Sequence, residues 1–231
     1  MEKKPIVLPP NTVIGVWKTN ILLGQGGQGA VWAAKPAKVK HTPQRALKAC
    51  FASEPQARSR FVREVETLRR CDSPNILKVY DQDLEWKEHA AGLPPFAYFV
   101  GEKCQGSMEQ RQPHLGDARR RLELFKQACA AVRYLHTMAD PVIHRDIKPA
   151  NFLIAHELSN VVLADFGIAR ALSDSSLTQA FEIVGTPYYR APEVLHGSRG
   201  TIESDVYGLG RLLASSDPRS PFSVDESAAT P

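Results

Sequence analysis

The first hundred residues contain short apolar runs that are separated by glycine, proline and charged residues. Runs of this length that are rich in β-branched and aromatic side chains are typical of strands. The sequence therefore predicts strands over 17–23, 30–34, 46–51, 76–86 and 96–104, with a glycine-rich turn between the first two. Phe61, Val65 and Leu68 instead recur at helical spacing, which predicts an amphipathic helix over 57–70.

The pattern turns helical after Asp117, a residue type that often caps the N-terminus of a helix. The predicted apolar face of this helix comprises Leu122, Phe125, Cys129, Val132 and Leu135. Further along the chain, the sequence predicts a hairpin over 152–154 and 161–164 and a last helix over 204–214.

This order of elements predicts an α+β fold with two lobes. The predicted parts are an irregular lead-in over 1–11, a β-rich N-terminal lobe over 12–104, a helical C-terminal lobe over 105–214, and a disordered tail over 215–231. A ligand site is expected at the boundary between the lobes, because ligands favour the clefts between domains.

Composition and charge narrow the classes of function. Of the 231 residues, 43% are hydrophobic and 23% are charged, as in a globular protein with a buried core. The net charge of +4 is modest and no basic run is interleaved with aromatic residues, so a nucleic-acid partner is not expected. The four cysteines lack metal-ligand spacing, no apolar stretch reaches the roughly 18 residues of a membrane span, and no apolar leader begins the chain. We therefore expect free thiols and a cytoplasmic protein without a membrane segment.

The strongest chemical signal is a loop that reads His-Arg-Asp-Ile-Lys-Pro-Ala-Asn over residues 144–151. After the predicted hairpin comes Asp-Phe-Gly over 165–167. The two stretches supply a lysine, an amide and two carboxylates. Transfer of a phosphoryl group from a magnesium nucleotide needs such a set, because one carboxylate orients the attacking hydroxyl while the other carboxylate and the amide hold metal.

Together the two motifs resemble the catalytic and metal-binding loops of the eukaryotic-type serine/threonine protein kinases, and the N-terminal part is most similar to bacterial members. The resemblance implies ATP and Mg²⁺ as cofactors. It implies that Asp146 orients the acceptor hydroxyl and that Lys148 neutralises charge on the transferring phosphoryl group. It also implies that Asn151 and Asp165 hold the metal ions.

A glycine cluster follows the first predicted strand and has the pattern Gly-x-Gly-x-x-Gly-x-Val. Glycines let the backbone approach phosphate oxygens closely. The same spacing occurs in dinucleotide-binding folds, but there it opens a helix, whereas here a strand is predicted to follow. The residues expected around the nucleotide are Gly24, Gln25, Gly26, Gly27, Gln28, Gly29, Val31 and Ala46.

Lys48 lies in the third predicted strand, where the resemblance implies that its ammonium binds the nucleotide phosphates. Its expected partner is a carboxylate on the following helix, either Glu64 or Glu66. Glu64 shares the inward face of Phe61 and Leu68, whereas Glu66 points to the opposite side of the helix. We therefore predict that Glu64 pairs with Lys48 and belongs with it to the catalytic machinery.

The resemblance also implies how adenine is bound. Glu102 and Cys104 would contact it through backbone groups. Gly101 falls at a position where most members of the family have a larger residue, such as methionine or threonine. We therefore expect a pocket behind the adenine that accepts ATP analogues with bulky N6 substituents.

Several residues indicate the substrate class and its regulation. Lys148 and the stretch 185–193 match the serine/threonine branch, so protein Ser/Thr hydroxyls are the expected acceptors. The resemblance implies that Arg145 binds a phosphate on the segment before residue 190, that Thr186 bridges Asp146 and Lys148, and that Asp205 anchors the catalytic loop. Candidate autophosphorylation sites within 173–186 include Ser173, Ser175, Ser176 and Thr178.

The chain is short after Asp205 compared with the family, which predicts an incomplete C-terminal lobe and an exposed apolar surface on the Asp205 helix. Two expectations follow: an active kinase, or a catalytically poor protein that binds nucleotide or a partner. A small-molecule phosphotransferase is disfavoured, because those enzymes have His-Gly-Asp in place of His-Arg-Asp and lack the Ala-Pro-Glu found at 191–193.

Overall fold

The computed structural model describes residues 8–9, 11–26, 29–39, 41–90, 92–155, 160–166 and 187–214. These residues form two compact units. The first unit comprises Met1–Arg70 and Lys78–Lys103, and the second comprises Cys71–Leu77 and Cys104–Pro231. Gly27, Gln28, most of the lead-in, the segment 167–186 with its candidate phosphorylation sites, and the tail over 215–231 lie outside the described residues.

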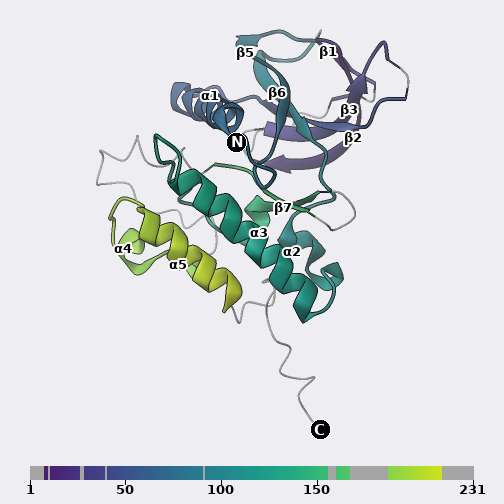
Figure 1. The fold of residues 1–231 in the computed structure, drawn as a ribbon. Helices are drawn as coiled ribbons and strands as arrows, with labels where there is room; N and C mark the ends of the chain where they lie inside the picture. The colour runs from purple at the N-terminus through teal and green to yellow at the C-terminus, as the bar shows by residue number, and fades with distance from the viewer. Residues whose placement is uncertain are drawn as a thin grey trace. The chain divides into compact units, whose positions relative to one another are not determined.

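The first unit is built on one antiparallel sheet with the strand order β1-β2-β3-β4-β6-β5 (Figure 1). The strands are β1 Val13–Ile14, β2 Trp17–Gly26, β3 Gly29–Pro36, β4 Arg45–Cys50, β5 Val79–Lys87 and β6 Phe96–Glu102. The five predicted strands are confirmed. Their ends differ at the glycine cluster, because β2 and β3 continue into it, and at the start of β5, which begins later than predicted.

A hydrogen bond shows that the sheet is strongly curled. The indole Nε1 of Trp17, in β2, donates to Oδ2 of Asp81, in β5, at 2.6 Å. These strands are four positions apart in the sheet, about 19 Å if the sheet were flat. Curling encloses Trp32, Phe96 and Val100 in the interior of the sheet, where all three side chains are buried.

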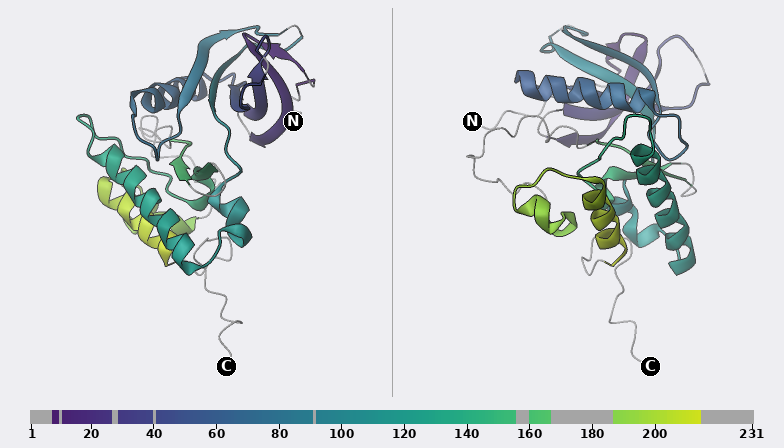
Figure 2. Two further views of the ribbon diagram at one scale, coloured as in Figure 1. Left: turned by 45° about the vertical axis from the view of Figure 1, so that its right-hand side comes forward. Right: turned by 60° about the vertical axis from the view of Figure 1, so that its left-hand side comes forward.

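The predicted helix over 57–70 is confirmed as α1, Pro55–Arg70. Its inward side chains Phe61, Val65 and Leu68 are buried. The Phe61 ring lies 6.2 Å from the Trp86 ring of β5 and 5.9 Å from the Phe99 ring of β6, measured between centroids. The helix therefore covers one face of the sheet, as the turned views in Figure 2 show.

The second unit is mostly helical and contains one hairpin. Its elements are α2 Met108–Arg111, η1 Gln112–His114, α3 Ala118–His136, η2 Pro149–Asn151, β7 Phe152–Ala155, β8 Asn160–Leu163, η4 Pro187–Tyr189, α4 Pro192–Leu195 and α5 Ile202–Leu213. The long helices α3 and α5 lie side by side in every view (Figures 1 and 2). The hairpin and both long helices were predicted, whereas the short helices were not.

The start of α3 was predicted correctly, but its buried face was predicted only in part. Oδ1 of Asp117 accepts a hydrogen bond from the Arg120 N–H at 2.8 Å, which is an N-cap. Leu122 was expected in the core, but its side chain is 45% exposed. The residues of α3 that are buried are Leu124, Ala128, Ala131, Val132 and Leu135. The prediction overlooked Leu124 and the two alanines, whose small side chains allow neighbouring backbone to approach closely.

Two expectations from composition can be compared with the structure. All four cysteines are free thiols, as expected. Among the residues that the structure describes, no helix has both the length and the apolar character needed to cross a membrane. The expected exposure on α5 is also present, since Val206 is 55% exposed and Leu213 and Ile202 are partly exposed.

Candidate active site

The first unit contains the predicted ion pair of Lys48 and Glu64. Lys48 lies on β4, opposite Val31 of β3 and Phe99 of β6. Its Nζ is 2.7 Å from Oε1 of Glu64 on α1, with 27% and 12% of the two side chains exposed. Glu66 is exposed. The helical face therefore distinguished the two carboxylates correctly. A half-buried pair of this kind contributes little net stability, and its main effect is to hold the ammonium in one place.

The glycines of the cluster meet two different requirements. A Cβ added to Gly29 would clash with the carbonyl oxygen of Ala49 on β4, so packing between strands demands glycine there. A Cβ added to Gly24 or Gly26 would meet no described atom within 4 Å. Packing against described atoms therefore does not explain glycine at those two positions, where the bare backbone would allow a ligand to approach closely.

Two residues that were expected to contact adenine are placed in different units. The backbone N–H of Glu102 donates to the Lys78 carbonyl at 3.2 Å, so any contact of its backbone with a base would use the carbonyl group. Ala46 and Gly101 face each other across β4 and β6. Cys104 begins the segment Cys104–Pro231 of the second unit, and its side chain is partly exposed.

The second unit brings Asp146, Lys148 and Asn151 together. Nζ of Lys148 is 2.7 Å from Oδ2 of Asp146. Nδ2 of Asn151 donates to the Asp146 carbonyl at 2.7 Å and to Oδ2 of Asp146 at 3.0 Å. Both side-chain contacts of Asp146 fall on Oδ2, so Oδ1 faces away from these donors. This arrangement can hold a hydroxyl group by accepting its hydrogen bond at Oδ1.

The hairpin places Asp165 next to Asn151. In the register of β7 and β8, Phe152 pairs with Leu163, and the Ala164 N–H donates to the Asn151 carbonyl at 3.0 Å. Asp165 adopts a left-handed backbone conformation with φ of +53°. Among the described residues no cluster of three or more His, Cys, Asp or Glu is present. One amide oxygen and one carboxylate nevertheless suit Mg²⁺, which binds through one or two protein oxygens, substrate phosphates and water.

Asp205 holds the loop that begins at His144, as predicted. Its side chain is 1% exposed and accepts hydrogen bonds from the backbone N–H groups of His144 at 2.7 Å and Arg145 at 2.8 Å. Arg145 has φ of +67°, a conformation that side chains rarely adopt. The two hydrogen bonds hold this strained turn, and the turn sets the position of Asp146.

His136, at the end of α3, was missed by the sequence analysis. Its Nε2 lies 2.9 Å from Oδ2 of Asp205, and both side chains are nearly buried. A buried carboxylate needs hydrogen bonds to offset its loss of hydration, and His136 provides the third one. No sequence pattern indicated this contact, because a histidine in the last turn of a helix is also common on surfaces.

His144 is a packed residue in the centre of the loop. Burial lowers the pKa of its imidazole. Nδ1 accepts a hydrogen bond from the Asp146 N–H at 3.3 Å, so Nε2 carries the proton and donates to the Ala164 carbonyl at 3.2 Å. The ring also contacts Phe166, with 5.2 Å between centroids. His144 therefore links the loop to the strand that leads to Asp165.

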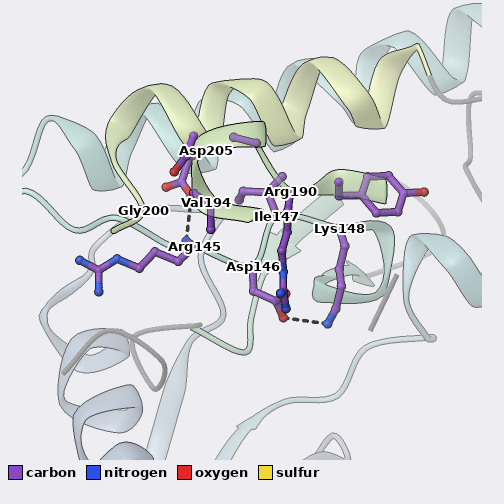
Figure 3. A pocket seen from close by; sticks show the side chains of 11 residues that line it. Arg145, Asp146, Ile147, Lys148, Arg190, Val194, Gly200 and Asp205 are labelled. Carbon is purple, nitrogen blue, oxygen red and sulfur yellow. Dashed lines mark hydrogen bonds and ion pairs between the residues drawn. The ribbon is translucent and has the colours of Figure 1, made fainter. Parts of the chain in front are cut away.

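A small hollow of about 30 Å³, open to solvent, adjoins Asp146 (Figure 3). It is lined by Arg145, Asp146, Ile147, Lys148, Tyr189, Arg190, Ala191, Val194, Gly200, Ser204 and Asp205. The sequence analysis had given no role to Arg190. Thr186, which was expected to bridge Asp146 and Lys148, lies outside the described residues, and Glu193 is exposed.

Comparison with known proteins identifies this arrangement. A family profile described as "Protein kinase domain" matches residues 17–230. Serine/threonine-protein kinase PknB of Mycobacterium leprae is 34% identical over 197 residues, which are 83% of this chain and 30% of the relative. The Mycobacterium tuberculosis protein of the same name is 35% identical over 198 residues, with the same coverage of 83% and 30%. The probable serine/threonine-protein kinase PkwA of Thermomonospora curvata is 33% identical over 217 residues, which are 92% of this chain and 28% of the relative. The chain thus spans about 30% of the length of the curated relatives that it matches.

Proposed function

The chain belongs to the protein kinase family, and from this premise we propose that it transfers the γ-phosphate of ATP to serine and threonine hydroxyls of proteins. The observation that supports the proposal best is the contact of Asp146 with both Lys148 and Asn151, on a loop that Asp205 holds from α5. An oriented carboxylate, a cation and an oxygen ligand for metal are the groups that this reaction needs.

The first unit binds the nucleotide. Lys48 contacts the α- and β-phosphates, and Glu64 keeps its ammonium in position through the 2.7 Å ion pair. The backbone at Gly24 and Gly26 approaches the phosphates, because no side chain stands in the way at either position. In this proposal Glu102 contributes a backbone carbonyl to adenine.

The second unit provides the groups for transfer. Oδ1 of Asp146 accepts a hydrogen bond from the acceptor hydroxyl and aligns its oxygen for attack. Lys148, held on Oδ2, places positive charge near the phosphoryl group as negative charge develops on its oxygens. Oδ1 of Asn151 and the carboxylate of Asp165 would hold Mg²⁺, which would supply positive charge to the phosphate oxygens when bound.

The acceptors, sites and location in the cell are also part of the proposal. Protein Ser/Thr residues are the acceptors, and the segment 173–186 of this chain is one of them, by autophosphorylation. The reaction takes place in the cytoplasm, where ATP is plentiful and the four free thiols stay reduced.

Transfer of labelled γ-phosphate from Mg-ATP tests the proposal. The label should appear on the chain itself and on a generic basic protein. Asp146→Ala should abolish incorporation, whereas Asp72→Ala, which removes an exposed carboxylate of the same unit, should leave it unchanged. Transfer that survives Asp146→Ala would rule out the assigned role of this carboxylate.

The second candidate function is binding of nucleotide or a partner without turnover. It is favoured by the apolar side chains that α5 exposes, among them Val206 and Leu213. It predicts a folded protein that binds ATP but transfers no label to any acceptor. Lys48→Met would then weaken nucleotide binding, while Asp146→Ala would change nothing that can be measured.

A further inference from the structure

Arg190 lines the hollow beside Asp146 but has no role in the mechanism above. It lies between η4 and Ala191, which is the N-cap residue of α4. In Figure 3 its side chain extends toward the end of the hollow where the Asp146 carboxylate meets Lys148. The guanidinium of Arg145, by contrast, points toward the other end. Arg190 is therefore the arginine on the side of the hollow where the acceptor hydroxyl would lie.

The backbone next to Arg190 is held firmly by α5. Nε of Arg211 donates to the Tyr188 carbonyl at 3.0 Å, and the Arg211 guanidinium lies 4.0 Å from the centroid of the Tyr188 ring. Gly208 packs so closely that an added Cβ would come within 2.8 Å of Cβ of Ile147. A side chain that starts from a fixed backbone loses less freedom when it binds a ligand.

Both carboxylates that line the hollow, those of Asp146 and Asp205, already have partners. Lys148 is neutralised by Asp146 at 2.7 Å, and the Asp205 carboxylate is occupied by two backbone N–H groups and His136. None of the ion pairs between described residues involves Arg190. A guanidinium presents a fork of N–H donors that fits carboxylates and phosphates, so an open one favours an anionic ligand.

We propose that Arg190 selects acceptor peptides that have an anionic group, a carboxylate or a phosphate, on a residue next to the phosphorylated serine or threonine. The inference rests on the proposed function and names its substrate class. Neighbouring Cα atoms in a peptide are about 3.8 Å apart. When the acceptor hydroxyl lies at Asp146, the side chain of the adjacent peptide residue can therefore reach other side chains of the same hollow. A basic residue at that position is repelled, which sharpens the selection.

Peptides with one serine in a neutral background test the inference in the full chain. The residue beside the serine is asparagine, lysine, aspartate or phosphoserine, on one side or the other. The last two distinguish carboxylate from phosphate recognition. A charge-assisted contact of this kind corresponds to about a ten- to hundredfold preference in kcat/KM for the anionic peptide over its asparagine match. The gain should appear mainly in KM, because the contact is made to bound substrate and transition state alike.

Three variants separate the local contact from general charge effects. Arg190→Gln should remove the preference for anionic peptides, and Arg190→Lys should retain part of it. Arg199→Gln removes the same charge from an exposed position of the same unit that does not line the hollow. It should leave the preference unchanged.

The outcomes distinguish failure of the inference from failure of the proposed function. Equal rates for all peptides, or a preference that persists in Arg190→Gln, would overturn the inference while leaving the kinase assignment in place. A drop in kcat by the same factor for every peptide in Arg190→Gln would also overturn it, since that result assigns Arg190 to phosphoryl transfer. If no peptide or protein is labelled at all, the proposed function fails and this inference fails with it.

Discussion

Asp205→Asn tests how the catalytic loop is held in place. Oδ1 of the buried Asp205 carboxylate accepts from the Arg145 N–H at 2.8 Å, and Oδ2 accepts from the His144 N–H at 2.7 Å. Asparagine has the same shape, but one oxygen is replaced by an NH₂ group, which donates. Either orientation of the amide therefore leaves one backbone N–H facing another donor.

The magnitude follows from the number of hydrogen bonds that are lost. One hydrogen bond to a charged acceptor contributes about 1.5–3 kcal/mol, and a buried N–H left without an acceptor costs about 1–3 kcal/mol. The two effects overlap, so we expect the free energy of unfolding of the second unit to fall by about 2–4 kcal/mol. The strained φ of +67° at Arg145 should then relax, move Asp146 and lower kcat at least about tenfold.

Urea unfolding followed by circular dichroism measures the stability, and amide hydrogen exchange at His144 and Arg145 reports the two hydrogen bonds directly. Asp72→Asn is the matched control, because it makes the same chemical change at an exposed position of the same unit. It should change the free energy of unfolding by no more than about 0.5 kcal/mol. A loss below about 1 kcal/mol in Asp205→Asn, with unchanged exchange at both amides, would refute the reasoning.

Three further predictions follow from other parts of the chain. Gly29→Ala should lower the free energy of unfolding by about 2 kcal/mol or more, because its Cβ would meet the Ala49 carbonyl. Gly24→Ala should change this free energy by less than about 1 kcal/mol. Similar midpoints for the two variants in a denaturant titration would contradict this prediction. Burial lowers the pKa of His144, so below the ordinary histidine pKa of about 6.5 the unfolded chain binds a proton that the native state excludes. Stability should therefore be complete above that pH and fall as the pH decreases, by up to about 1.4 kcal/mol per pH unit, and His144→Phe should flatten this part of the curve of unfolding free energy against pH. Gly101→Met should weaken the binding of ATP analogues with bulky N6 substituents more than the binding of ATP. If a titration shows that such an analogue binds the wild-type protein and the Gly101→Met variant equally well, the expected pocket is excluded.

The elements with clear periodicity could be predicted from the sequence. The helix α1 and the long strands have apolar residues at spacings that arise from backbone geometry alone, and that geometry also favoured Glu64 over Glu66. The helices α2 and α4 were missed, because each has only four residues, too few for a pattern to repeat. Sequence reasoning about α3 placed Leu122 in the core wrongly. At the ends of an amphipathic helix, the neighbouring elements decide which side chains are buried.

The sequence by itself determined which chemical groups are present and in what order. It identified Asp146, Lys148 and Asn151 as one set, because residues this close along the chain share one loop in any fold. Only the tertiary structure decided that Asp205 and His136, from two different helices, meet the backbone of that loop. It also decided that Arg190 lines the hollow beside Asp146. Contacts of this kind depend on the packing of α3 and α5, and a helical pattern specifies an apolar face but not which distant residue will lie against it.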